Sequence, residues 1–244
     1  MNKKSYDITK MEIKSEKIGQ KTKIALVSDL HNSDYLELIK IIENETPDFI
    51  AVTGDFSTRY TNAYEKGINF LRDAAEIAPV FLSLGNHEVD FFKEKEMKIL
   101  RETGAIVLDN EFVKYNEFLI GGLTSEKSFS NFEFLKSFSD EDRHFKLLLC
   151  HHPEYYNMFL KNYAFDLILS GHAHGGQIRL PLIGGLFSPG QGIFPKLTSG
   201  MHFDKMIISR GLGNPNKLPR WFNKPEIIFI EISQCSDTIK IYSI

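Results

Sequence analysis

Cysteine is scarce in this sequence. Its 244 residues include only Cys150 and Cys235, which lie far apart and form no CxxC pair. The chain therefore offers no framework of several disulfides and no cysteine-based zinc motif. We expect a protein of a reducing compartment.

Long apolar runs and an excess of basic charge are also missing. No segment approaches the roughly 18 apolar residues that a membrane span requires. Residues 1–20 begin with positive charge but contain no apolar core of a signal peptide. The chain has 29 Lys and Arg against 32 Asp and Glu, and no basic stripe interleaved with aromatic residues, so a dedicated nucleic-acid binder is disfavoured. We expect a soluble, cytoplasmic protein.

Repeats, low-complexity tracts and long linkers are absent, so we expect a single domain over residues 1–244. Short apolar runs predict five buried strands, at residues 24–27, 49–52, 80–84, 147–150 and 167–169. Amphipathic segments at 63–78 and 90–102 predict helices between them. Strands that alternate with helices favour an α/β fold.

The second half changes character. After a glycine- and proline-rich loop at residues 181–200, three strand-like segments follow without helices between them, at 206–209, 227–232 and 239–244. We expect a second, partly antiparallel sheet packed on the first. Ile228, Ile230 and Ile232 should share one face of their strand, because side chains alternate along a strand.

Each of the five predicted strands ends in polar residues. The endings are Ser-Asp-Leu-His (28–31), Thr-Gly-Asp (53–55), Gly-Asn-His-Glu (85–88), His-His-Pro (151–153) and Ser-Gly-His-Ala-His (170–174). Taken singly, most have a structural explanation as turns, helix caps or solvated loop residues. The last is stronger, since two histidines flanked by glycine leave room for a metal ion. Together, five such endings predict one metal site at the carboxyl edge of a sheet.

The donor types limit the metal and its chemistry. Imidazole and carboxylate groups without thiolates suit Mn²⁺, Fe²⁺ or Zn²⁺. Two such ions can acidify a bridging water and clamp the attacking and leaving oxygens of an in-line displacement. Their residual positive charge suits a phosphate anion.

The ordered set of endings resembles the calcineurin-like metallophosphoesterase superfamily. The run GHAHGGQIRLPLIGGL, the later Ser209-Arg210-Gly211-Leu212-Gly213 and Pro225-Glu226-Ile227 are similar to its bacterial branch related to the phosphodiesterase YaeI and the phosphatase YkuE. The resemblance covers residues 23–230. It implies two packed mixed β-sheets flanked by helices, in four αββα layers. It also implies a dinuclear enzyme that hydrolyses phosphate mono- or diesters by in-line attack of a metal-bridging hydroxide.

The same resemblance implies roles for eight residues. The first metal would be bound by Asp29, His31 and His174, the second by Asn86, His151 and His172, with Asp55 bridging both and His87 stabilising the transition state or protonating the leaving oxygen. We expect His152 to point elsewhere. Thr58 stands where members of the superfamily often have Asp or Asn.

Several alternatives stay open. The fold could serve as a metal-free scaffold, or the enzyme could act on a lipid-linked pyrophosphate. The apolar segments 182–187 and 193–195 either cover the second sheet, the simpler interpretation, or form an exposed lip that contacts a membrane surface. Trp221-Phe222 is expected to anchor the C-terminal loop in the core. A nuclease is the weaker reading, although Arg59, Lys127, Arg179 and Arg210 are candidates for phosphate contacts.

Overall fold

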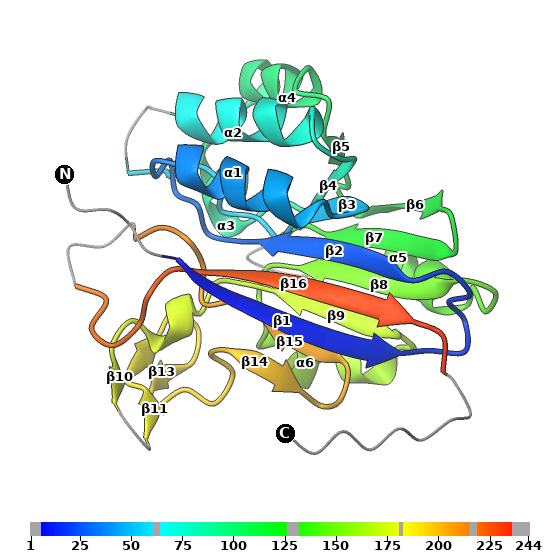
Figure 1. Ribbon diagram of the computed structural model, residues 1–244. Coiled ribbons are helices and arrows are strands. Elements are labelled where there is room, and N and C mark those ends of the chain that lie inside the picture. The colour runs from blue at the N-terminus through cyan, green and yellow to red at the C-terminus, as the bar shows by residue number, and fades with distance from the viewer. Residues whose placement is uncertain (1–5, 61–63, 126–131, 181–182, 215–218, 236–244) are drawn as a thin grey trace.

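The computed structural model describes residues 6–60, 64–125, 132–180, 183–214 and 219–235. Its centre is a pair of six-stranded mixed sheets, with strand orders β1-β16-β2-β3-β4-β5 and β14-β15-β9-β8-β7-β6. Figure 1 shows helices α1, α2 and α4 over the outer side of the first sheet, and the second sheet behind it.

The first sheet combines the two termini of the described chain with the predicted N-terminal strands. Its strands are β1 (Asp7–Lys14), β16 (Glu226–Ser233), β2 (Thr22–Val27), β3 (Phe49–Val52), β4 (Val80–Leu82) and β5 (Ile106–Val107). Strands β2 to β5 are parallel, whereas β16 runs antiparallel to β2 and parallel to β1. The carboxyl ends of β2, β3 and β4 therefore lie at one edge.

The outer face of this sheet is buried by the helices that connect its strands. These are α1 (Leu36–Glu45), α2 (Glu65–Ala75), α3 (Asn86–Phe91) and α4 (Glu94–Arg101). The predicted helix at 90–102 is interrupted, because Phe92 and Lys93 adopt extended backbone angles between α3 and α4. Leu38, Ile42 and Leu71 pack there with residues on the outer face of the sheet such as Val27 and Val52.

The second sheet is built from the middle of the chain. Its strands are β6 (Glu111–Tyr115), β7 (Phe118–Leu123), β8 (Phe145–Cys150), β9 (Leu167–Ser170), β14 (Gly200–His202) and β15 (Met206–Ile208). Its outer face packs on α5 (Phe132–Ser139), α6 (Tyr155–Met158) and the short 3₁₀ helix η1 (Leu160–Asn162). The remaining elements are the 3₁₀ turn η2 (His174–Gly176) and two hairpins, β10 (Arg179–Leu180) with β11 (Gly184–Gly185) and β12 (Phe187–Ser188) with β13 (Gly192–Ile193).

A shared apolar layer joins the two sheets. The ring of Phe49 on β3 lies edge-on to Phe118 on β7, with ring centroids 5.4 Å apart, and Ile228, Ile230 and Ile232 of β16 face the same layer. The four-layer αββα class is therefore confirmed, as is the common face of the three isoleucines. The expectation of a single domain stays a prediction.

The five strands predicted to carry the polar endings are all present, but one expectation about the sheets is wrong. Strand β16 belongs to the first sheet rather than the second, since both of its faces are buried, one against the helices and one against the second sheet. Strands β1, β5, β6 and β7 were not predicted. Most of them carry polar or exposed residues that weaken the apolar signal. The predicted strand at 239–244 lies outside the described residues.

The apolar loop does not cover the second sheet. Ile183, Phe187, Ile193 and Phe194 are exposed, and so are Trp221 and Phe222, which were expected to enter the core. The prediction that the loop covers the second sheet is therefore wrong, and so is the prediction that Trp221-Phe222 enters the core. Polar contacts hold the loop in place instead. Gln191, for example, exchanges hydrogen bonds with both backbone groups of Leu197. Leu182 lies outside the described residues.

Within the described ranges, none of the helices is long and apolar enough to span a membrane.

The burial of the layer between the sheets predicts how substitutions there change the free energy of unfolding. Ile230 is fully buried between the sheets, so Ile230→Ala should lower the free energy of unfolding by about 2–5 kcal/mol through lost burial and a residual cavity. Ile8→Ala, on the exposed part of β1, should change it by about 0.5 kcal/mol or less. Urea denaturation in the presence of EDTA measures both values. Equal losses for the two variants would contradict the proposed core.

Candidate metal centre

The polar endings come from two sheets rather than from one sheet edge. Those after β2, β3 and β4 belong to the first sheet, and those after β8 and β9 belong to the second. Loop contacts bring the two sets together. The backbone N–H of Asp29 donates to Gly54 O within the first set, and His172 N–H reaches the Asp29 carboxylate across the sheets at 3.1 Å. Seven of the eight predicted residues therefore meet in one region, and the eighth, Asn86, directly precedes His87 at the start of α3.

Asp29, His31 and His174 form a buried group. The Nε2 atoms of the two histidines lie 3.2 Å apart, and Asp29 Oδ1 lies 3.8 Å from His31 Nε2 and 3.5 Å from His174 Nε2. Ligand atoms that share one ion at about 2.0–2.2 Å must lie within about 4.4 Å of one another. These three atoms meet that condition.

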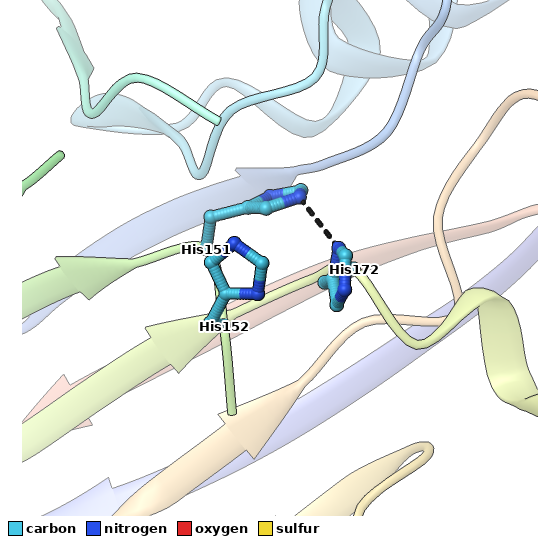
Figure 2. A group of neighbouring side chains, drawn as sticks. All are labelled: His151, His152 and His172. Carbon is cyan, nitrogen blue, oxygen red and sulfur yellow. Dashed lines mark hydrogen bonds between the residues drawn. The ribbon is translucent and has the colours of Figure 1, made fainter. Parts of the chain in front are cut away.

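A second group forms around His151. Its Nε2 atom lies 3.1 Å from His172 Nδ1 and 3.2 Å from Asp55 Oδ2. Figure 2 shows the rings of His151 and His172 facing each other across this gap. Asn86 Oδ1 is buried, and no hydrogen-bond partner for it is found in the described part of the chain.

Asp55 Oδ2 lies between the two groups. It is 3.2 Å from His151 Nε2 on one side and 3.9 Å from His31 Nε2 on the other. The second oxygen, Oδ1, accepts a hydrogen bond of 2.9 Å from the backbone N–H of His87, which fixes the carboxylate.

Backbone carbonyls set the tautomers of two histidines. His31 Nδ1 lies 3.2 Å from Ser57 O, and His151 Nδ1 lies 2.7 Å from Thr53 O. A carbonyl only accepts, so each Nδ1 must carry the proton it donates. The lone pair of each Nε2 is then directed into its group, as ligation of a metal requires.

Burial and the neighbouring carboxylate set the charges. Burial lowers the pKa of His31 and of His174 to about 3, so both imidazoles are neutral. For His151, burial alone would lower the pKa, but the adjacent Asp55 carboxylate outweighs it and raises the value to about 10. Without an ion, a proton therefore holds Asp55 and His151 together, and a cation bound there takes that proton's place.

These residues fit divalent ions. His174 Nδ1 and Asn86 Oδ1 are buried polar atoms for which the described residues supply no hydrogen-bond partner. Leaving such atoms unpaired costs free energy unless another group binds there. The opposed ring nitrogens, only 3.1–3.2 Å apart in each group, likewise need a cation or a proton between them. Nitrogen and oxygen donors without sulfur match Mn²⁺, Fe²⁺ or Zn²⁺.

His87 lies against both groups but is oriented differently. Its Nδ1 accepts a 3.2 Å hydrogen bond from the backbone N–H of Arg59, so in the neutral ring the proton is on Nε2. That Nε2 lies 3.8 Å from Asp55 Oδ2. Burial, with a contribution from Arg59, lowers the pKa of His87 and favours the neutral form. The ring therefore presents an N–H donor to the centre.

His152 does not point elsewhere, so that prediction is wrong. Its ring centroid lies 4.0 Å from that of His172, and Figure 2 shows it beside the His151–His172 pair. The alternation of side chains ends with β8, so neighbouring residues beyond it can face the same way. His152 Nδ1 contacts Glu154 Oε1 at 3.1 Å, and its ring stacks on Tyr155.

A cavity of about 420 Å³ opens beside this group. Asn86 and His152 form its wall next to the candidate metal ligands, and Tyr155, Met158 and Val89 make other parts of it apolar. Arg59 also lines the cavity and is paired with Asp90. By contrast, Arg210 is paired with Asp7 and Glu226, and Arg179 donates to Gly175 O. Lys127 lies outside the described residues.

Glu88 is an important residue to which the sequence analysis gave no role. Its buried carboxylate accepts hydrogen bonds from the backbone N–H groups of Asp55, Ser57 and Gly85 and from the Ser57 hydroxyl, at 2.8–3.0 Å. It thereby joins the loop after β3 to the start of α3. Burial, together with the nearby Asp55 charge, raises the pKa of Glu88 to about 7. The sequence shows Glu88 at the end of Gly-Asn-His-Glu, but it does not show that Asp55 and Ser57, more than 30 residues away, are its hydrogen-bond partners.

The backbone at the centre is strained. Residues other than glycine rarely adopt φ values between +45° and +65°. Five candidate ligands have φ values in this range, namely Asp29, His31, Asp55, His172 and His174. Close packing around the loops holds them there. The Ser-Arg-Gly-Leu-Gly segment supports the first loop, since Leu212 N–H donates to Ser28 O and Gly213 N–H donates to Asp29 O.

Comparison with known proteins agrees with this geometry. The family model described as calcineurin-like phosphoesterase matches residues 22–176. The uncharacterized metallophosphoesterase YkoQ of Bacillus subtilis (strain 168) is 31% identical over 234 residues, 87% of this chain and 84% of YkoQ. YkuE of the same organism, also named an uncharacterized metallophosphoesterase, is 28% identical over 84% of this chain and 77% of its own length. The phosphodiesterase YaeI of Escherichia coli (strain K12) is 28% identical over 86% of this chain and 82% of YaeI. The resemblance to the superfamily and to this branch is confirmed.

Gly171 tests whether the loop packing creates the metal centre. A Cβ at this position would collide with Ser28 Oγ and lie 2.5 Å from Asp29 Oδ2. Gly171→Ala should therefore displace Asp29 and weaken Mn²⁺ binding by about 10–100-fold, the range typical of changes that misplace a ligand. Isothermal titration calorimetry measures the affinity. Gly19→Ala, at an exposed loop position, is the control and should bind Mn²⁺ as the wild type does. Unchanged affinity in Gly171→Ala would refute the assignment of Asp29.

Glu88 provides a second test. Glu88→Gln replaces one acceptor oxygen by an N–H₂ group that faces backbone donors, so we expect the free energy of unfolding to fall by about 1–3 kcal/mol. The exposed Glu94→Gln on α4 should change it by about 0.5 kcal/mol or less. Denaturant titrations without metal compare the two variants. If the two lost the same amount, Glu88 would not be the link between these loops.

Proposed function

The chain belongs to the calcineurin-like phosphoesterase family and is a hydrolase of phosphate esters, and we propose that it uses two divalent metal ions in this reaction. The ions are Mn²⁺, Fe²⁺ or Zn²⁺, in keeping with the donor set. The substrates are phosphate mono- or diesters. The relative named phosphodiesterase supports the diester class.

The position of Asp55 is the observation that carries the proposal. A carboxylate oxygen within 4 Å of both His31 Nε2 and His151 Nε2 is suited to bridge two ions. Asp29, His31 and His174 would hold the first ion, and Asn86, His151 and His172 the second. Two carboxylates among seven ligands leave the occupied site positive, which favours an anionic phosphate.

Two bound ions would supply a hydroxide for in-line attack on phosphorus and neutralise the charge that develops on the phosphate. The protein's own contribution at the leaving group is His87. Its Nε2–H is fixed by the hydrogen bond that Nδ1 accepts from Arg59, so it can donate to the oxygen of the departing alcohol. The backbone N–H of His87 meanwhile holds Asp55 in its bridging orientation.

The cavity supplies room for the organic part of the ester. Its volume of about 420 Å³ lies within the range of small-molecule sites, and its apolar wall suits a carbon skeleton. Asn86, a proposed ligand, and Arg59, a cation, lie at its edge. An ester bound at the metal centre can therefore extend its alcohol group into this space.

The alternatives have less support. A metal-free scaffold would have no need for seven donor side chains, five of them on strained backbone, or for the buried polar atoms of Asn86 and His174 that the described residues leave without a hydrogen-bond partner. A lipid-linked pyrophosphate is the second candidate substrate. The exposed apolar side chains of the loop after His174 favour it, since they lie next to the centre in the chain.

The proposal predicts metal content and activity together. The wild type loaded with Mn²⁺ should retain two ions per chain by mass spectrometry of the metal and should cleave p-nitrophenyl phosphate, bis-p-nitrophenyl phosphate, or both. Asp55→Asn should lose metal and at least about 100-fold of turnover, because it removes the bridging charge. His87→Ala should keep both ions and lose about 10²–10⁴-fold of turnover, as expected for a missing general acid.

Three results would contradict these assignments. A protein that held two ions but cleaved neither ester would refute the activity. Full metal content in Asp55→Asn would refute the bridge. Full turnover of His87→Ala on both esters would refute the role of His87.

A further inference from the structure

A group of large apolar side chains lies exposed beside the metal centre. We call this group the apolar rim and define it by the residues Leu180, Ile183, Phe187, Ile193, Phe194, Trp221 and Phe222. Ile193 is 72% exposed and Phe222 is 79% exposed. Soluble proteins rarely expose so many large apolar residues together without a binding role.

Backbone hydrogen bonds make the rim one surface. Phe187 and Ile193 are paired across the β12–β13 hairpin, and Leu186 N–H donates to Ile178 O, which connects this hairpin to the β10–β11 segment. Arg179 N–H donates to Trp221 O at 3.0 Å. Figure 1 shows both hairpins gathered at one end of the molecule.

Buried polar contacts hold the backbone beneath the rim in place. Asn223, directly after Phe222, is buried and its Nδ2 donates to His174 O at 2.7 Å and to Gln177 O at 3.0 Å. The same turn contains Gly176, whose carbonyl accepts from Leu186 N–H. The exposed side chains are thus held outward by polar contacts behind them, one of which is made to the backbone of a candidate metal ligand.

The sequence segments that carry the rim are rich in basic residues. Between Gly171 and Pro225 the sequence contains seven Lys or Arg residues and a single acidic residue, whereas the whole chain has a net charge of −3. Lys196 stands two residues after Phe194 and is exposed. Lys224 stands two residues after Phe222, and 64% of its side chain is exposed, with its Nζ 3.9 Å from Asp7 Oδ1. Phenylalanine and tryptophan flanked by lysine are typical of protein surfaces that bind at the headgroup level of a bilayer.

We propose that the apolar rim docks the protein onto a lipid bilayer that contains anionic lipid. The apolar side chains enter the boundary between headgroups and acyl chains, and the lysines meet the negative surface potential. A second copy of the chain fits less well, because a symmetric contact would place the cationic flanks of both copies against each other. Docking would bring the centre around His174 close to the lipid headgroups, although the docking itself does not depend on catalysis.

Vesicle co-sedimentation of the full chain tests this proposal. We expect binding to vesicles of phosphatidylcholine mixed with phosphatidylglycerol, and weaker binding to phosphatidylcholine alone. The double variant Phe194→Ser/Phe222→Ser should lower the bound fraction at least about tenfold, because two large apolar side chains no longer enter the bilayer. Lys196→Gln/Lys224→Gln should weaken binding to the mixed vesicles and reduce its sensitivity to salt.

Leu36→Ser is the matched control, because Leu36 is a 62% exposed apolar residue on α1 outside the rim. It should bind vesicles as the wild type does. Hydrolysis of p-nitrophenyl esters in solution and circular dichroism should be unchanged in all these variants, which shows that they are folded. Equal vesicle binding by the wild type and the Phe194→Ser/Phe222→Ser variant would overturn the proposal. So would the absence of vesicle binding together with a dimer that this variant dissociates, because the rim would then be an interface between copies.

Discussion

The burial of two carboxylates, Asp29 and Asp55, is the constraint on which the rest of the structure depends. A charged group removed from water is costly unless other charges and hydrogen bonds compensate it. Here the compensation comes from histidines of both sheets, with Asp55 in contact with His31 on one side and His151 on the other. Because neither sheet alone supplies enough partners, the arrangement of the carboxylates ties the two sheets together at this end.

Keeping these groups in place requires a backbone that would be unfavourable elsewhere. The ligand loops turn through left-handed conformations, and they stay there because neighbouring groups leave no room for an alternative. Gly171 lets the Asp29 loop approach closely, and the buried carboxylate of Glu88 gathers the N–H groups of the next two loops. The apolar layers on both faces of each sheet stabilise the fold, while these few polar contacts fix the distances between the candidate ligands.

The same end of the molecule has two different surfaces. The cavity beside Asn86 and His152 is hollow and partly apolar, which suits the organic group of an ester. The apolar rim projects from the segment after His174, whose β12–β13 hairpin also lines the cavity through Gly190. Both surfaces begin at loops that also carry candidate ligands, so substrate contact and docking to a larger surface would converge on one centre without any rearrangement of the sheets.

The sequence by itself determined the donor residues and most of the elements that carry them. Apolar runs followed by Asp, Asn or His indicated strands with functional ends, because burial and strand periodicity are local properties that a short segment already expresses. The order of these endings was specific enough to indicate the family. Only the tertiary structure decided that the endings divide between two sheets and that β16 lies in the first of them. It also decided that His152 faces His172, that Glu88 bridges two loops, and that Phe194 and Trp221 are exposed. Each of these features depends on a partner distant in the chain, and a local pattern records that a residue is apolar or polar but not which surface will meet it.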